Sequence, residues 1–416
     1  MSGGARGAIV AAGMATGPGR RLVRGGDPAT KVVAGPAAVA WDDGIIVYAG
    51  AADGLPWAPT FGSPEGGYLV PGFVDCHVHL PFVGWRADEF EARLGGASYR
   101  DLHGRDLDGG ESGIFRSSSQ FRAASDDEVL DFCRPIVREM ALHGTTAMEL
   151  KTGYGLSVEQ ELRQARVARR LADVAPQTCT VTLLGCHAVP PDIDRDAWVG
   201  RVCEELIPAA AAEDLADAVD IYVEDIAYTL EDLERVAAAA AAASLRLRVH
   251  ADQLGPTRAT EAGVRLGARS VDHLNMTSDA GVRALGAAPE TAAVLLPASS
   301  FMLRAPMPPV DALRRAGAAF AIATDLNPGT APVCSMPEAV SIACALYGIP
   351  PLETLIATTA NAAWVLGLHD SLGALEPGMR ADIALLDGSS FADVPYRPGH
   401  NPLRATLVAG ELVSER

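Results

Sequence analysis

The sequence predicts an α/β protein: a (β/α)8 TIM barrel with a small β-sandwich-like domain built from both ends of the chain. Three observations lead to this prediction. The chain has 416 residues, of which 49% are hydrophobic and 21% charged, so it can bury a large core. Short apolar runs alternate with amphipathic or alanine-rich segments through its middle. Both ends instead carry short β-like runs separated by turns that contain glycine.

The number of apolar runs in the middle of the chain indicates a barrel. We expect strands at about 72–79, 145–151, 179–187, 218–224, 246–251, 270–274, 292–297 and 319–325. Helical patterns between these runs include 127–142, 158–172, 230–243 and 257–266. Eight strands with intervening helices place the barrel at 69–365, so 1–68 and 366–416 would form the two parts of the small β-domain.

Charge and cysteine usage exclude several classes of protein. The formal net charge is −18, and no basic run is present, so the chain is a poor partner for nucleic acid or an anionic membrane surface. The apolar run 8–15 is too short to span a membrane. Seven cysteines without any C-x-x-C pair indicate reduced thiols and a cytoplasmic protein.

Histidines follow several of the predicted strands at their carboxyl ends, where barrel enzymes place their chemistry. His77 and His79 are two residues apart on the first strand, so both rings point to the same side. His250 ends the fifth strand and Asp325 the eighth. Three imidazoles and one carboxylate suit one divalent metal ion with a position left for water. An H-x-H pair alone would be weak evidence, because two polar residues on an edge strand give the same pattern.

Several motifs resemble the amidohydrolase superfamily and, more closely, the imidazolonepropionase family. The wider resemblance lies in Pro-Gly-Phe-Val-Asp-Cys-His-Val-His at 71–79 and in the segment 373–383. The closer one lies in the segments 149–156, 184–191, 250–253, 323–330 and 396–399. This family hydrolyses the cyclic amide 4-imidazolone-5-propanoate to N-formimino-L-glutamate in histidine degradation. The resemblance therefore implies a metal-dependent hydrolase with one Zn2+ or Fe2+ per chain and suggests a homodimer.

The resemblance also implies the roles of individual residues. Asp325 would bind the metal and carry a proton from water to the leaving nitrogen, and His273 would hydrogen-bond the water or the developing oxyanion. Arg86 would grip the carboxylate of the anionic small-molecule substrate. The other implied substrate-binding residues are Tyr99, Tyr154, His187, Gln253, Asn327, Gly329 and Thr330. The alternatives are a core position for His273, packing roles for the tyrosines, and a surface ion pair of Arg86 with Asp88 or Glu89.

Three features bear on this assignment. The loop 101–113 is longer than is usual in the family, and we assign no role to His103 within it. Lys151, one of only two lysines, lies in a family motif, and structural support is the interpretation we favour. The resemblance to imidazolonepropionases implies that Gln253 takes part in catalysis. Its amide can donate and accept hydrogen bonds but cannot exchange a proton at neutral pH.

Two other functions remain as alternatives. The first is an aminohydrolase of the same superfamily that acts on a purine or pyrimidine analogue, for which a glutamate would be expected at position 253. The second is a catalytically inactive barrel with a binding or structural role. That reading predicts the loss of at least one metal ligand, and all four are present in the sequence.

Overall fold

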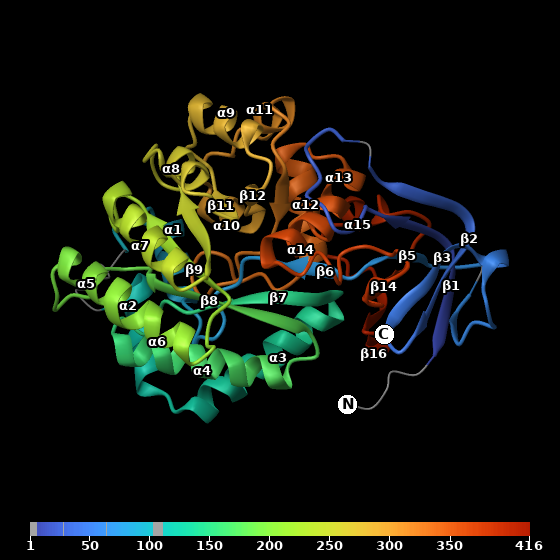
Figure 1. The fold of residues 1–416 in the computed structure, drawn as a ribbon, viewed down its shortest axis with the longest axis horizontal. Helices are drawn as coiled ribbons and strands as arrows, with labels where there is room; N and C mark the ends of the chain where they lie inside the picture. Colours follow the sequence, from blue (N-terminus) through green and yellow to red (C-terminus); the bar gives the residue numbers. More distant parts are fainter. Residues whose placement is uncertain (1–5, 28, 64, 103–110) are drawn as a thin grey trace.

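The computed structural model describes residues 6–27, 29–63, 65–102 and 111–416 and contains the predicted barrel (Figure 1). Its eight strands pair in parallel and in chain order. They are β6 (Phe73–Asp75), β7 (Thr145–Lys151), β8 (Thr178–Cys186), β9 (Ala218–Val223), β10 (Arg246–Ala251), β11 (Ser270–His273), β12 (Ala292–Leu295) and β13 (Phe320–Ile322). Each lies within one residue of, or inside, an apolar run that predicted it, so the barrel prediction is confirmed.

The barrel closes between the segments that extend its first and last strands. Val78 and Leu326 form a parallel bridge, and the N–H of His79 donates to the carbonyl oxygen of Leu326 at 2.8 Å. Below this bridge, the buried carboxylate of Asp75 accepts from the backbone N–H of Thr324 at 3.0 Å and from its hydroxyl at 2.6 Å. These contacts hold the segment that carries His77 and His79 beside the segment that carries Asp325.

Helices surround the barrel and connect its strands (Figure 1). They are α1 (Ala87–Leu94), α2 (Gly113–Ala123), α3 (Asp126–Leu142), α4 (Val158–Val174), α5 (Arg195–Arg201), α6 (Ile207–Ala212), α7 (Leu230–Ala242), α8 (Ala259–Arg265), α9 (Asp279–Ala287), α10 (Pro297–Leu303), α11 (Val310–Arg315), α12 (Met336–Tyr347), α13 (Pro351–Ala357) and α14 (Ala360–Leu366). Capping side chains fix where several of them begin. Ser125 with Glu128 and Thr229 with Asp232 form capping boxes at α3 and α7.

A second sheet combines strands from both ends of the chain. Its order is β16-β15-β14-β5-β1-β2-β3, with β4 paired to β1. The strands are β1 (Gly7–Thr16), β2 (Lys31–Asp42), β3 (Ile45–Ala51), β4 (Phe61–Gly62), β5 (Tyr68–Pro71), β14 (Ile383–Leu386), β15 (Leu403–Val408) and β16 (Glu411–Glu415), and α15 (Asp393–Tyr396) precedes β15. In Figure 1, the blue N-terminal strands lie beside the red C-terminal ones. The terminal β-domain is therefore confirmed, whereas its boundaries at 68 and 366 stay a prediction.

Alternation along the barrel strands gives an apolar outward face and an inward face that carries both polar and small apolar side chains. On β7, Met148 and Leu150 pack into the outer core with α3 and α4, while Glu149 and Lys151 point the other way and are fully buried. Small apolar side chains, among them Ala147 and Ala321, fill the barrel interior below this charged layer. The polar side chains above it can therefore gather at one end of the barrel.

The cysteines and the length of the helices bear on two further predictions. All seven cysteines are free thiols, as their spacing predicted. In the described ranges, no helix combines the length and the apolar character that crossing a membrane requires.

Candidate metal centre and substrate pocket

The four predicted metal ligands meet at the carboxyl end of the barrel. The Nε2 atom of His79 lies 3.2 Å from Nε2 of His77 and 3.5 Å from Nε2 of His250. Asp325 Oδ1 lies 3.5 Å from His77 Nε2 and 3.4 Å from His79 Nε2. A Zn–N bond of about 2.05 Å gives a tetrahedral edge of ~3.3 Å between neighbouring donors. The donor spacing therefore fits one transition-metal ion.

Buried carboxylates orient two of the histidines. Asp272 Oδ2 lies 2.6 Å from Nδ1 of His77, and Asp220 Oδ2 lies 3.0 Å from Nδ1 of His250. A carboxylate at Nδ1 fixes the tautomer, so that the lone pair of Nε2 is free to bind a metal. Burial also lowers the pKa of His77 and His79 well below its usual value, which keeps both imidazoles neutral. Both effects suit metal binding.

These carboxylates belong to a connected group of five fully buried charges, which we call the interior ion cluster: Glu149, Lys151, Asp220, Arg248 and Asp272. Lys151 Nζ donates to Asp220 at 2.6 Å and lies 2.9 Å from Glu149. Arg248 contacts Glu149 and donates to Asp272 at 2.9 Å. Burial opposes ionisation of Asp220, but His250, Lys151 and Arg248 hold its pKa well below the usual range. The cluster explains the placement of Lys151 and agrees with the structural role that we favoured.

His273 and Asp325 enter the site through unusual backbone conformations. Strand alternation would turn His273 to the outside together with Val271, but its φ of 79° redirects the ring into the barrel mouth. Its ring and the carboxylate of Asp325 come within 4.8 Å of one another. Burial lowers the pKa of His273 to about 3, so its imidazole is neutral at physiological pH, and burial raises the pKa of Asp325.

A narrow pocket of about 40 Å³ lies above the four donors. It is lined by His79, Arg86, Tyr99, Ile114, Tyr154, His187, Tyr222, His250, Gln253, His273, Asp325, Asn327 and Thr330. Every substrate-binding residue that the resemblance implied therefore lines this pocket except Gly329. His103 falls outside the described residues. The volume is enough for a few water molecules, so a substrate requires lining side chains to move.

Arg86 is buried in the pocket wall, and it forms the alternative ion pair with Glu89 there rather than at the surface. It is 5% exposed, its Nε lies 3.3 Å from Glu89 Oε2, and its Nη1 donates to the Ser117 hydroxyl at 2.9 Å. Asp88 pairs with Arg116 instead. Gly329 contributes by lacking a side chain, because a Cβ there would overlap the guanidinium of Arg86.

The loop that carries Tyr154 is fixed by one buried acid. Glu161 accepts hydrogen bonds from the backbone N–H groups of Gly153 at 3.0 Å, Gly155 at 2.7 Å and Leu156 at 3.0 Å. Gly153 has a φ of 118°, and a Cβ there would press on the ring of His187. Tyr154 and His187 are therefore held beside His79, with which the ring of His187 stacks at 5.2 Å.

The positions of Asn327 and Gln253, two further predicted site residues, are set by hydrogen bonds in their loops. The side-chain oxygen of Asn327 accepts from the N–H of Thr330 at 2.7 Å and its amide donates to the backbone of Asp325, so it shapes the loop after the eighth strand. Glu224 accepts from the N–H groups of Gln253 at 2.6 Å and Leu254 at 2.9 Å. Burial raises the pKa of Glu224 to about 7.

Several residues that shape the site were not predicted from the sequence. Tyr222 lines the pocket from β9, and its ring lies 5.8 Å from that of His250. Asp220, Arg248 and Asp272 also went unnoticed, together with Glu224. Strand periodicity could have indicated Arg248, because it stands two residues before His250 and so points to the same side of β10.

Comparison with known proteins agrees with this geometry. The amidohydrolase family model matches residues 68–413. Imidazolonepropionases from Shewanella sp. (strain ANA-3) and Shewanella putrefaciens are 40% identical over 386 residues, which cover 91% of this chain and 93% of each relative.

Solved structures share the fold at lower identity. An adenosine deaminase from Xanthomonas campestris with bound zinc superposes with a TM-score of 0.69 at 19% identity over 97% of this chain and 92% of that one. The guanine deaminase of E. coli gives a TM-score of 0.69 at 15% identity over 99% of both chains. These structures support the barrel and terminal sheet. The family match and the 40% identity go further: this chain belongs to the amidohydrolase family and, within it, to the imidazolonepropionases.

Proposed function

We propose that this chain hydrolyses 4-imidazolone-5-propanoate to N-formimino-L-glutamate, a reaction of histidine degradation. The observation that carries the proposal is the clustering of the four donors around His77 at the barrel mouth, beside a pocket that three of them line together with the buried Arg86. The relationship at 40% identity to imidazolonepropionases supports it. The catalytically inactive alternative has no support, because all four donors are present and correctly spaced.

The chain is a metal-dependent enzyme, and we propose that His77, His79, His250 and Asp325 hold the ion. Three imidazoles and a carboxylate suit both Zn2+ and Fe2+. Such an ion activates water and polarises a carbonyl. Elemental analysis of the purified protein would identify the metal, and about one ion per chain is expected.

Asp325 and His273 would handle protons beside the scissile bond. Because burial raises the pKa of Asp325, this carboxylate can accept a proton from water and release it to the departing ring nitrogen. His273 stays neutral and can hydrogen-bond the developing oxyanion. Gln253 lines the same pocket and would bind the ring through its amide.

Arg86 would recognise the propanoate of the substrate. Arg86 lines the same pocket as Tyr99 and three of the four proposed metal ligands, which supports this role. A guanidinium binds a carboxylate through two parallel hydrogen bonds. We also propose that the chain forms a homodimer and acts in the cytoplasm. Sedimentation velocity would test the dimer.

Deamination of a nucleobase is the second candidate, since adenosine and guanine deaminases share this fold. Gln253 argues against it, because glutamine cannot carry the proton that a departing amine needs. One experiment separates the two: freshly generated imidazolonepropanoate, guanine, cytosine and adenosine are offered to metal-loaded protein. We expect ring opening of the imidazolone and negligible ammonia from the bases. Ammonia release at a comparable rate would replace the proposal with the aminohydrolase.

A further inference from the structure

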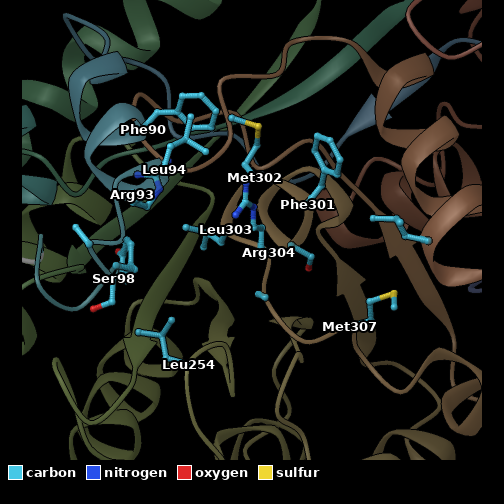
Figure 2. A pocket seen from close by; sticks show the side chains of 15 residues that line it. Phe90, Arg93, Leu94, Ser98, Leu254, Phe301, Met302, Leu303, Arg304 and Met307 are labelled. Carbon is cyan, nitrogen blue, oxygen red and sulfur yellow. The ribbon is translucent and has the colours of Figure 1, made fainter.

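A second cavity, drawn in Figure 2, is larger than the metal-centre pocket and shares only Tyr99 with its lining. Its volume is about 710 Å³, within the range typical of small-molecule sites. Figure 2 shows that Phe90 and Leu94 enter it from α1, whereas Phe301 and Arg304 enter from α10 and the residue that follows it. Tyr99 lines both cavities, so the two share a wall.

The walls of this cavity expose apolar side chains to solvent. Leu94, Phe301 and Met307 are each more than half exposed, and Phe90 and Leu346 add to the same surface. Large apolar side chains gathered in one concave surface are unfavourable in water and are typical of a binding site. An occupant with an apolar body would remove this surface from water.

The charges of the cavity are all of one sign. Arg93 and Arg304 line it, and none of its described lining residues is acidic, although the whole chain carries 52 Asp and Glu residues. Arg93 donates through Nη2 to the carbonyl of Gly329 at 3.1 Å, while its buried Nε has no hydrogen-bond partner among the described residues. The cavity therefore offers two cations to an anion.

We propose that this cavity is a binding site for a monoanion with an apolar body, such as a medium-chain or aromatic carboxylate. The apolar walls would enclose the body and the two arginines would bind the anionic group. The proposal is independent of the function proposed above, because Arg304, Phe301 and Met307 do not line the metal-centre pocket.

Fluorescence titration of the metal-loaded full-length protein with 8-anilinonaphthalene-1-sulfonate tests the proposal. We expect one saturable site from which decanoate displaces the dye, whereas decanol at the same concentration and inorganic sulfate do not. Arg304→Gln should weaken dye binding about fivefold or more, because one ionic contact is lost. Met307→Ser should weaken it by a similar factor through lost apolar contact.

Two controls keep the test specific. Arg283→Gln on α9 and Leu142→Ser at the end of α3 change exposed residues outside the cavity and should leave dye affinity unchanged. Unchanged affinity in both cavity variants would overturn the proposal. So would displacement by decanol as effective as that by decanoate. A dimer that Met307→Ser dissociates, with no saturable dye site, would show instead that a second copy of the chain covers this surface.

Discussion

Replacing Lys151 with methionine tests whether the interior ion cluster supports the metal centre. Methionine keeps most of the side-chain volume but removes the cation that donates to Asp220 at 2.6 Å and lies 2.9 Å from Glu149. All three side chains are inaccessible to solvent, so water cannot replace the lost contacts. Removing one partner from a buried ion pair costs about 3–5 kcal/mol. We expect a loss of that size in the free energy of unfolding, measured by urea denaturation.

The same substitution should weaken metal binding. Lys151 helps to hold the pKa of Asp220 below its usual range, and Asp220 orients His250. Without the lysine, Asp220 gains a proton more readily and orients the imidazole less firmly. Loss of such a supporting contact typically costs 10- to 100-fold in metal affinity, which competition with a chromogenic chelator would measure.

The only other lysine supplies the matched control. Lys31 is exposed on β2, so Lys31→Met should change stability by less than about 0.5 kcal/mol and leave metal affinity unchanged. A double-mutant cycle with Asp220→Asn should give a coupling energy of at least about 1 kcal/mol. Wild-type stability and metal affinity in Lys151→Met would refute the reasoning.

Three further predictions concern the pocket. Arg86→Met should retain its metal but lose roughly 30- to 1000-fold in kcat/KM for imidazolonepropanoate, mainly through KM; an unchanged KM would place the substrate carboxylate elsewhere. Gly329→Ala should also raise KM, since a Cβ there displaces Arg86, and wild-type kinetics would contradict that role. Burial raises the pKa of Glu224 from its ordinary value of 4.5 to about 7 in the folded protein, so the folded state binds this proton more tightly than the unfolded state. The stabilisation that the bound proton gives the folded state is therefore lost as pH rises from about 4.5 to 7. Wild-type protein should therefore lose stability relative to Glu224→Gln between pH 5 and pH 8 in urea denaturation, and a constant difference would exclude titration of Glu224 in this window.

The barrel was predictable because its signals are local. Parallel strands buried on both faces appear as short apolar runs, and capping residues such as Ser125 mark helix starts. Strand β1 of the terminal sheet was not predicted. Residues 7–16 are mostly alanine and glycine, which have little preference for strands, and β1 takes its place by pairing with β2 and β5. Such pairing depends on contacts that no local pattern contains.

The clustering of the proposed metal ligands was predictable for a related reason. Each lies at or just beyond the carboxyl end of a strand, and all these strand ends meet at one mouth of the barrel. Asp220 and Asp272, whose carboxylates contact the Nδ1 atoms of His250 and His77, reach these positions through the register of the strands, which the sequence does not show. Only in the folded sheet does Asp220 stand opposite Arg248, and Asp272 opposite His250.

The charge balance of the barrel interior connects these observations. Glu149, Asp220 and Asp272 bring three carboxylates against two cations, and Asp325 adds a fourth carboxylate above them. Because burial keeps His77 and His79 neutral, these two imidazoles do not balance this excess of two negative charges. A divalent cation at the four donors would balance it, whereas another carboxylate in the pocket would increase it. An uncharged amide at position 253 is therefore consistent with the electrostatics of this site as well as with ring opening that needs no second proton carrier.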